Sequence, residues 1–464
     1  MVKFSNSQLD QVFLAYDIRG QVPDQLNEEF YEQLGKAFVT FLNAKKIAVG
    51  YDIRPDSKVF TSAFIKGATS LGCDCINVGE ISTEMIYFIT GARVELDGGA
   101  VITASHNPAG WNGCKMVGHG ASPISEEYGL KEIKELMLAD KFQQSSTIGK
   151  ISEENIYPAF KEKILSFIGA IKIKPLKIVV DAGNGIGGKI FDYVFGQLPL
   201  DVIKMYFEPD GMFPNHVPDP LKEENVAEIK ERTVEEKADI GIAIDGDADR
   251  VFFIDNKGRN PSGVYTGALF ARYFLKSNPG EKIIHCVRVA FAMRKEAEKA
   301  GGIPIMNRVG HSPFKKRMKE EKAIFAAEMS SHFYYRDFYN ADSGMITIAL
   351  MLKMLSQGLD FDKEMDYMYE TYPDSGEVNY VVDDVQGTIE KVEAAYKDGK
   401  IIKIDGVSVE YDDWRFNLRP SNTQPLIRLN VEGKTEDVIV ENFRKIEKII
   451  GGKRDNLPRL TALQ

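Results

Sequence analysis

Three segments of this chain begin in the same way and constrain its fold more than any other feature. Each starts with Lys-Ile, continues as a short apolar run, passes through a loop and enters a helix-like stretch: Lys46–Arg54, Lys177–Gly185 and Lys282–Ala290. Repeats this far apart exclude a solenoid, whose period is about 20 to 50 residues. Strands that alternate with helices are typical of α/β layers, so three related α/β units are expected. Their helices are predicted at Glu28–Leu42, Val59–Leu71, Glu153–Gly169, Val226–Lys237, Arg294–Ala300 and Pro313–Glu321.

The C-terminal region has a different pattern. Strand-like runs at Val407–Tyr411, Trp414–Leu418 and Pro425–Glu432 precede an amphipathic helix. The apolar residues of that helix are Val438, Phe443, Ile446, Ile449 and Ile450. Strands followed by a helix predict a separate α+β domain. Thr371–Gly376 has the composition of a linker into it.

Charge and composition exclude several classes of protein. The 464 residues suffice for about three or four domains, and 44% hydrophobic with 27% charged residues is ordinary for a soluble globular protein. A net charge of −10 argues against a general nucleic-acid binder, although it permits a local basic pocket for an anionic substrate. No feature points to an obligate protein partner.

The cysteines and the apolar stretches predict a cytoplasmic protein. Cys73 and Cys75 form C-x-C without a second pair, so neither a zinc site nor a disulfide framework is expected among the four cysteines. Residues 1–13 have no apolar core of a signal peptide. Gly344–Leu352 is apolar but is interrupted by Lys353, which predicts a buried helix and no membrane span.

A serine follows an apolar strand in the segment Thr103–Lys115. Ala100–Ile102 is strand-like, and the Asn-Pro turn after Ser105 prevents a strand from continuing. The hydroxyl of Ser105 is therefore expected at a strand end, with His106 beside it and Lys115 nearby. A hydroxyl among cationic groups suits phosphate chemistry. The alternative is a turn serine that makes only a local backbone hydrogen bond.

Three aspartates alternate in a loop between two strand-like runs. Asp245, Asp247 and Asp249 would repel one another unless a cation lies among them, and hard oxygen ligands suit Mg²⁺. A calcium EF-hand also opens with this pattern, but Arg250 stands where that loop needs glycine and Asn256 where it needs glutamate. A solvated acidic hairpin tip is the remaining alternative.

Two further loops suit a phosphosugar. Glu328–His332 follows an apolar strand-like run and offers an acid, hydroxyls and an imidazole to sugar hydroxyls, although a surface loop with a helix-capping serine explains it about as well. Arg419–Gln424 joins two strands, and its guanidinium, hydroxyls and loop N–H groups can cradle a phosphate. A β-turn with an incidental arginine is the alternative there.

A glycine pattern supports a competing function. Gly183, Gly185 and Gly188 satisfy G-x-G-x-x-G after a strand, and Asp201 follows at a suitable distance, which is compatible with dinucleotide binding. That interpretation leaves the serine, aspartate and arginine loops unexplained. A tight strand-to-helix turn also requires glycines for conformational reasons alone.

The four loops, in this order and spacing, closely resemble the α-D-phosphohexomutase superfamily over essentially the whole chain. Thr103–Pro108, with Ser105, is similar to the phosphoserine loop of that family, and Asp245–Arg250 to its metal loop. Glu328–His332 resembles the sugar-recognition loop and Arg419–Pro425 the phosphate-binding loop.

Smaller matches place the chain within that family. Tyr16–Gly20 and Gly310–Ser312 match two further family segments, and Glu-Met-Ser at Glu328 resembles the phosphomannomutase/phosphoglucomutase branch. The phosphoglucosamine mutase branch usually has Gln where Met329 stands. There are also departures: Ala248 and Ser331 stand where glycine is usual, and Arg288 stands where this branch often has lysine.

The resemblance implies an α/β fold of four domains around a central cleft, three related α/β units with mixed sheets and a smaller C-terminal α+β domain. The expected bounds are 1–152 with the phosphoserine loop, 153–255 with the metal loop, 256–370 with the sugar-recognition loop and 371–464 with the phosphate-binding loop.

It also implies a reaction. Ser105 would carry a phosphoryl group, and Asp245, Asp247 and Asp249 with one phosphoserine oxygen would hold Mg²⁺. Arg250 would stabilise the phosphoryl oxygens. A hexose 1-phosphate would become a hexose 1,6-bisphosphate, turn round, and leave as hexose 6-phosphate after returning its other phosphate to Ser105.

The remaining residues would serve proton transfer and substrate binding. The resemblance suggests Lys115, Arg19 and His311 for proton transfer or charge balance, and His106 for support of the phosphoserine loop. Substrate binding would fall to Glu328, Ser330, His332, Arg419, Ser421, Asn422, Thr423, Tyr16 and Arg288. Ring hydroxyls away from C2 would be recognised, so both glucose and mannose would be accepted. Phosphoglucosamine mutase and a non-catalytic sugar-phosphate-binding relative are the alternatives.

Overall fold

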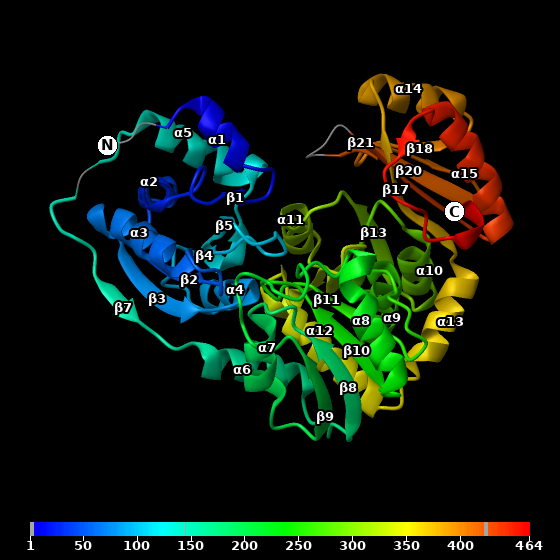
Figure 1. The fold of residues 1–464 in the computed structure, drawn as a ribbon, viewed down its shortest axis with the longest axis horizontal. Coiled ribbons are helices and arrows are strands. Elements are labelled where there is room, and N and C mark those ends of the chain that lie inside the picture. The colour runs from blue at the N-terminus through cyan, green and yellow to red at the C-terminus, as the bar shows by residue number, and fades with distance from the viewer. Residues whose placement is uncertain (1–3, 144, 422–425) are drawn as a thin grey trace. The chain divides into compact units, whose positions relative to one another are not determined.

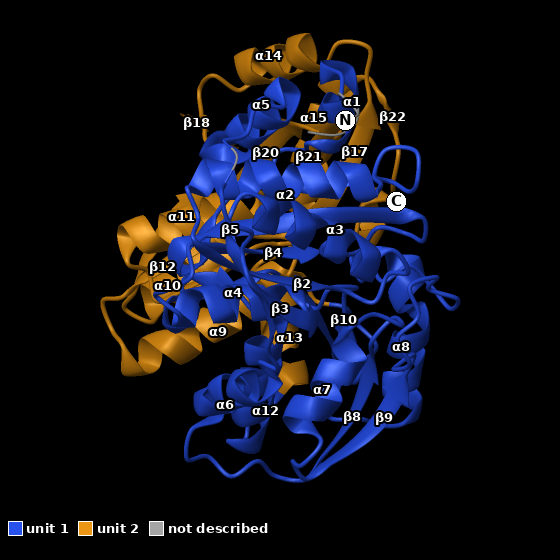
Figure 2. Ribbon diagram, turned by 90° about the vertical axis from the view of Figure 1, so that its left-hand side faces the viewer, with its two compact units in different colours: residues 1–260, 332–360 blue, residues 261–331, 361–464 orange. Residues whose placement is uncertain are grey.

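The computed structural model describes residues 4–143, 145–421 and 426–464 (Figure 1). By its internal contacts the chain divides into two compact units, coloured separately in Figure 2. The first unit comprises residues 1–260 and 332–360, and the second residues 261–331 and 361–464. Within the described part of the chain, no helix is long and apolar enough to cross a membrane.

The first sheet of the first unit carries the predicted serine loop. Its strand order is β1-β5-β4-β2-β3-β7, with β6 on the edge of β5. Strand β2 is parallel to its neighbours β3 and β4, and β3 is parallel to β7. Strand β5 is antiparallel to β1 and β4. The strands are β1 (Ile18–Gln21), β2 (Lys46–Tyr51), β3 (Asp74–Glu80), β4 (Gly98–Ile102), β5 (Trp111–Gly118), β6 (Ser122–Pro123) and β7 (Ile151–Glu153). The helices of this part are α1 (Asn6–Val12), α2 (Glu28–Leu42), α3 (Ser57–Ser70), α4 (Thr83–Ala92) and α5 (Lys131–Ala139).

The second sheet of this unit carries the aspartate loop. Its order is β11-β10-β8-β9, with β11 antiparallel to β10 and the other pairs parallel. The strands are β8 (Leu176–Asp181), β9 (Leu200–Met205), β10 (Ile240–Ile244) and β11 (Val251–Ile254), and the helices α6 (Tyr157–Ile168), α7 (Gly187–Phe195) and α8 (Glu223–Glu235). The antiparallel pair β15 (Phe333–Tyr335) and β16 (Ala341–Asp342) leads into α12 (Gly344–Ser356), which is buried as predicted.

In the second unit, β12 (Lys282–Cys286) lies between β13 (Ile303–Asn307) and β14 (Phe325–Ala327), parallel to both. The helices that accompany these strands are α9 (Gly263–Ser277), α10 (Phe291–Lys299), α11 (His311–Glu321) and α13 (Phe361–Thr371).

The C-terminal residues of the second unit form a sheet of their own. The order is β18-β19-β20-β21-β17-β22, and every pair in it is antiparallel. The strands are β17 (Asp374–Val381), β18 (Lys400–Ile402), β19 (Val407–Glu410), β20 (Trp414–Pro420), β21 (Leu426–Gly433) and β22 (Lys453–Arg454), with helices α14 (Val385–Ala395) and α15 (Glu436–Ile450). Phe443 and Ile446 of α15 pack into the core against this sheet.

These elements confirm the α/β prediction with a separate α+β C-terminal domain, and they correct two details. The helix predicted from Glu153 begins at Tyr157, because Ile151–Glu153 pairs with β3 as a strand. The predicted linker Thr371–Gly376 is mostly regular structure: α13 runs to Thr371 and β17 begins at Asp374. The turn-forming residues of this segment lie at the start of β17, where the strand has a bulge between Asp374 and Glu377.

Candidate active site

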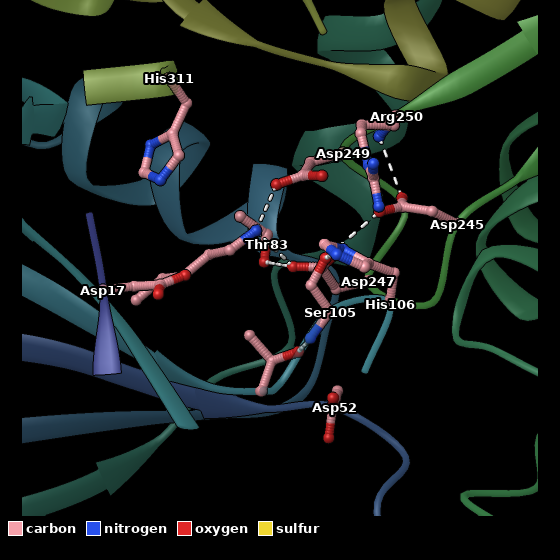
Figure 3. Close-up of polar contacts among 12 residues, drawn as sticks. Asp17, Asp52, Thr83, Ser105, His106, Asp245, Asp247, Asp249, Arg250 and His311 are labelled. Atoms are coloured by element: carbon pink, nitrogen blue, oxygen red, sulfur yellow. Dashed lines mark hydrogen bonds and ion pairs between the residues drawn. The ribbon is translucent and has the colours of Figure 1, made fainter. Parts of the chain in front are cut away.

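Ser105 lies three residues beyond the end of β4, as the apolar run before it predicts. Its backbone has φ 49°, in the left-handed region that L residues rarely adopt, and its N–H donates to Thr103 Oγ1 at 2.9 Å. The side chain is almost fully buried. Its hydroxyl lies 3.2 Å from His106 Nδ1 and donates to Asp245 Oδ2 at 3.3 Å (Figure 3). The serine is therefore aimed at the aspartate loop.

The aspartate loop is the tight connection between β10 and β11. Asp245, Asp247 and Asp249 are all buried, and one carboxylate oxygen of each lies within 4.8 Å of the others. Asp247 Oδ1 and Asp249 Oδ1 have no hydrogen-bond partner. Buried carboxylate oxygens without a donor are costly, and these two, grouped with the carboxylate of Asp245, fit a hard divalent cation. The solvated hairpin tip considered above is excluded by this burial.

Cationic side chains surround the aspartates. Lys115 Nζ lies 2.7 Å from Asp247 Oδ2 and 2.5 Å from Asp249 Oδ2, and Arg250 Nε donates to Asp245 Oδ2 at 2.9 Å. Burial opposes the charge of Lys115, but Asp247 and Asp249 raise its pKa above the ordinary value. Burial raises the pKa of Asp245 to about 7 against the opposing charge of Arg250. For Asp247 burial acts in the same upward sense, yet Lys115 and Arg19 outweigh it and lower the pKa.

His106 and Arg19 complete the surroundings of the serine. Burial, reinforced by the charge of Arg250, lowers the pKa of His106 well below its ordinary value, so the imidazole is neutral. Arg19 is buried in β1, with Nη2 2.6 Å from Asp17 Oδ2, and its Nη1 donates to Asn107 Oδ1 at 3.1 Å. Tyr16 lies half-buried in the bend before β1.

Helix α4 also reaches the aspartate loop. The N–H of Thr83 donates to the carbonyl oxygen of Asp247 at 3.1 Å, and its hydroxyl donates to Asp247 Oδ2 at 2.5 Å. No sequence motif indicated Thr83. A threonine at a helix start is ordinarily read as a cap, so only the fold reveals this contact.

The glycine turn after β8 supports the aspartate loop. The N–H of Ile186 donates to the carbonyl oxygen of Gly246 at 3.2 Å, and a Cβ on Gly185 would lie 2.7 Å from that same oxygen. The turn is filled by the protein's own backbone, at the place where the dinucleotide interpretation needs a pyrophosphate. Gly185 therefore serves the close packing of two loops.

His332 belongs to the first unit. Its Nδ1 lies 2.8 Å from Asp342 Oδ2 and 4.0 Å from Asp249 Oδ1. The predicted sugar-recognition loop thus divides at the boundary between the units, since Glu328 and Ser330 belong to the second.

In the second unit, two predicted loops meet. Glu328 is buried at the end of β14, and its Oε2 accepts from the N–H of Gly310 at 2.9 Å. This bond fixes the loop before α11, whose first residue is His311. Ser330 lies half-buried beside Glu328 in sequence.

An arginine cluster in the second unit brings together the other predicted binding residues. Arg288 Nη1 and Arg419 Nη2 lie 3.3 and 3.2 Å from Glu377 Oε2, and Arg428 Nη1 lies 3.3 Å from Glu377 Oε1. Arg428 Nη2 also donates to Ser421 Oγ at 3.1 Å. Although burial opposes ionisation, the three guanidinium groups lower the pKa of Glu377 to about 2. Three cations around one anion leave a net positive site suited to a phosphate.

Four family models match this chain between residues 10 and 448. Phosphoglucomutase/phosphomannomutase α/β/α domains I, II and III match residues 10–169, 158–258 and 262–372, and the C-terminal domain of that family matches residues 377–448. A protein named phosphohexose mutases from Xanthomonas campestris pv. campestris is 39% identical over 95% of this chain and 99% of its own length. The chain belongs to the phosphoglucomutase/phosphomannomutase family.

Other relatives agree. A phosphomannomutase of Escherichia coli K12 is 38% identical over 92% of this chain and 96% of its own length. A crystal structure of a phosphoglucomutase/phosphomannomutase family protein from Burkholderia thailandensis superposes with a TM-score of 0.87 at 30% identity, covering 96% of this chain and 99% of that one. The chain is thus a four-domain phosphohexomutase, an isomerase, as its motifs suggested.

Two departures from the family pattern now have a structural explanation. Ala248 has φ 61° and Ser331 has φ 63°, both in the left-handed region. The glycine usual at these positions is the residue that adopts this region without strain. Ala248 and Ser331 therefore adopt this conformation at a local cost.

Several functional candidates lay beyond sequence reasoning. Arg428 and Glu377 carry no motif of their own, and they reach the phosphate-binding loop only because β17, β20 and β21 are adjacent. The predicted residues Asn422 and Thr423 lie outside the residues that the structure describes.

Proposed function

We propose that this phosphohexomutase interconverts hexose 1-phosphate and hexose 6-phosphate through a phosphoryl group carried on Ser105. The observation that carries the proposal is the aim of the Ser105 hydroxyl at Asp245, 3.3 Å away, within a ring of buried charged groups. A serine with a merely local role would not need buried aspartates and a buried ammonium around it, because burying charge is costly.

Asp245, Asp247 and Asp249 are the proposed ligands of Mg²⁺, joined by a phosphoserine oxygen. When bound, Mg²⁺ supplies positive charge that draws electron density from the phosphoryl group. The unpartnered oxygens of Asp247 and Asp249 support this assignment.

The chain's own residues then have distinct tasks. Arg250 and Lys115 offer N–H donors and positive charge to the equatorial phosphoryl oxygens, where negative charge is spread during transfer. Neutral His106, 3.2 Å from Ser105 Oγ, orients the hydroxyl oxygen. As the hydroxyl of a hexose 1-phosphate attacks phosphorus in line, its proton must leave and Ser105 Oγ must gain one. We assign proton transfer or charge balance to Lys115, Arg19 and His311, with Arg19 limited to charge balance because a guanidinium keeps its proton.

The second half of the reaction returns a phosphoryl group to the serine. The hexose 1,6-bisphosphate turns round, Ser105 Oγ attacks its other phosphorus atom, and hexose 6-phosphate leaves. The end that is not reacting must be held, and we assign this to Arg288, Arg419 and Ser421, with Asn422 and Thr423 as further ligands and Tyr16 as a supporting contact. Glu328, Ser330 and His332 are assigned to the ring hydroxyls.

Glucose and mannose phosphates are the proposed substrates, because recognition of hydroxyls remote from C2 does not distinguish them. The relative from Escherichia coli carries the name phosphomannomutase, which supports the mannose assignment. We place the enzyme in the cytoplasm, an assignment supported by four buried free thiols.

A side-by-side assay on glucose, mannose and glucosamine 1-phosphates tests the substrate assignment. The enzyme should convert the glucose and mannose esters with kcat/KM within about tenfold of each other, and the glucosamine ester much more slowly. Preference for glucosamine 1-phosphate would contradict it and favour the phosphoglucosamine mutase alternative.

A further inference from the structure

Arg54 makes an unusual set of contacts with the serine loop. It follows β2, and its side chain is almost fully buried. Nη2 donates to the carbonyl oxygens of Ser105 at 2.8 Å and Asn107 at 2.5 Å. Nη1 donates to the carbonyl oxygens of Pro108 at 3.0 Å and Trp111 at 2.9 Å. One guanidinium thus binds four backbone carbonyls across the loop from Ser105 to Trp111.

The guanidinium is itself held in place. Arg54 Nε lies 3.3 Å from Asp52 Oδ2, and Asp52 Oδ1 accepts from the N–H of Arg54 at 3.0 Å and from Ser57 Oγ at 2.7 Å. The ring of Phe213 lies 5.0 Å below the guanidinium carbon. Because Nη1 and Nη2 each donate to two carbonyl oxygens and Nε faces Asp52, the four carbonyls have a common reference.

The loop needs such a reference. Ser105 adopts φ 49°, a conformation that is strained for an L residue and persists only where the surroundings impose it. The carbonyl of Ser105 also faces Gly246 closely, since a Cβ on that glycine would lie 2.4 Å from the oxygen. The position of this carbonyl therefore sets the distance between the serine and the aspartate loop.

We propose that Arg54 is a positioning residue that fixes the Ser105 hydroxyl in register with the aspartate loop for phosphoryl transfer. This inference rests on the proposed role of Ser105. Arg54 acts through the backbone of the loop. Lysine cannot replace it, because an ammonium offers three donors from one point and cannot reach four carbonyls spread along a loop.

The test compares Arg54→Lys and Arg54→Ala with wild type and with a matched control, Arg93→Lys, in which an arginine of the same unit pairs with Glu154 at the surface. Steady-state kinetics with glucose 1-phosphate are measured, together with phosphate on Ser105 by intact mass after incubation with glucose 1,6-bisphosphate. Arg54→Lys should lower kcat about 100-fold with KM changed less than about threefold, since a displacement near 1 Å costs about that much. Added guanidinium should restore part of the activity lost in Arg54→Ala. It should leave the activity of Arg93→Lys unchanged.

A kcat for Arg54→Lys within about threefold of wild type would overturn the inference. A second pattern would also overturn it: Arg54→Lys loses kcat and gains KM by similar factors, its melting temperature falls, and guanidinium does not rescue Arg54→Ala. That pattern indicates a general loss of folding. Amide hydrogen exchange separates this from failure of the proposed function. Faster exchange confined to residues 103–112 in Arg54→Lys supports loop positioning even if wild type has no mutase activity, and unchanged exchange there contradicts it.

Discussion

The ammonium of Lys115 lies 2.7 Å from Oδ2 of Asp247, and both side chains are buried. Lys115 therefore balances part of the negative charge of the aspartate loop, and its positive charge opposes the binding of a metal ion at the other oxygens of the same carboxylates. Replacing it by methionine should tighten Mg²⁺ binding by at least about tenfold, because a nearby positive charge is removed. Calorimetric titration with MgCl₂ measures this.

The same variant has a second signature in stability. Without metal, Lys115→Met leaves buried carboxylates uncompensated and should melt below wild type, whereas saturating Mg²⁺ should recover most of the difference. Lys189→Met, which removes a surface lysine paired with Glu80, is the control and should change neither quantity. Unchanged or weaker Mg²⁺ binding in Lys115→Met would show that the charge of the lysine does not oppose metal binding.

Ser331 offers a test of backbone strain. Its φ of 63° costs a serine about 1–2 kcal/mol, whereas glycine avoids this cost but loses about 0.5–1 kcal/mol of chain entropy on folding. Ser331→Gly should therefore stabilise the protein by up to about 1.5 kcal/mol, seen as a higher melting temperature. Ser331→Ala keeps the strain and serves as the control. Equal melting temperatures of the two variants would argue against strain at this position.

His216 makes stability depend on pH. Its Nε2 lies 2.9 Å from Asp181 Oδ2 and its Nδ1 3.0 Å from the carbonyl oxygen of Val217, so the doubly protonated ring satisfies both acceptors. Burial opposes the charge, but the hydrogen bond and charge of Asp181 prevail and raise the pKa of His216. The stabilisation is therefore complete below the ordinary value of about 6.5 and is lost as pH rises through the raised pKa.

Thermal melts of wild type and His216→Gln check this dependence. The free energy of unfolding of wild type should exceed that of His216→Gln by on the order of 1–2 kcal/mol near pH 5.5, and this difference should shrink by about pH 9. A difference in unfolding free energy that is constant or grows with pH would contradict a charged pair between His216 and Asp181.

Arg428 is expected to bind the phosphate that is not reacting. Losing one charge-assisted hydrogen bond costs about 1.5–3 kcal/mol, so Arg428→Gln should raise KM for glucose 1-phosphate about tenfold or more. Its kcat should change little, since an interaction that is equal in ground and transition states affects binding alone. Arg444→Gln on α15 is the surface control. A fall in kcat at constant KM would instead place Arg428 at the reacting phosphate.

The sequence revealed the parts of this site that sit in continuous motifs. Ser105, the three aspartates and the Arg419 loop each follow an apolar strand, and the end of a strand is where periodicity gives way to turn residues. Helix α2 was predicted with its observed ends, because a helical apolar pattern and an Asn cap coincide there.

Residues joined only by tertiary structure escaped that reasoning. Arg54, Thr83 and Glu377 reach the functional loops through strand order and helix packing, which one sequence does not encode locally. The left-handed conformation of Ser331 was indicated only by the family resemblance, which has glycine at that position, because serine itself gives no sign of a positive φ. The segment at the start of β17 has the composition of a linker because it contains a bulge. Turn residues mark irregular backbone whether or not a strand continues through it.

The central claim is that Ser105 carries the phosphoryl group, and intact mass after incubation with glucose 1,6-bisphosphate and Mg²⁺ tests it most directly. Wild type should gain the mass of one phosphoryl group and should still carry it after turnover of hexose 1-phosphate, because each turnover returns a phosphoryl group to Ser105. Ser105→Ala should gain none and lose mutase activity by a factor of about 10³ or more. A phosphorylated fraction that survives Ser105→Ala, or near-wild-type activity without any phosphoenzyme, would contradict the account.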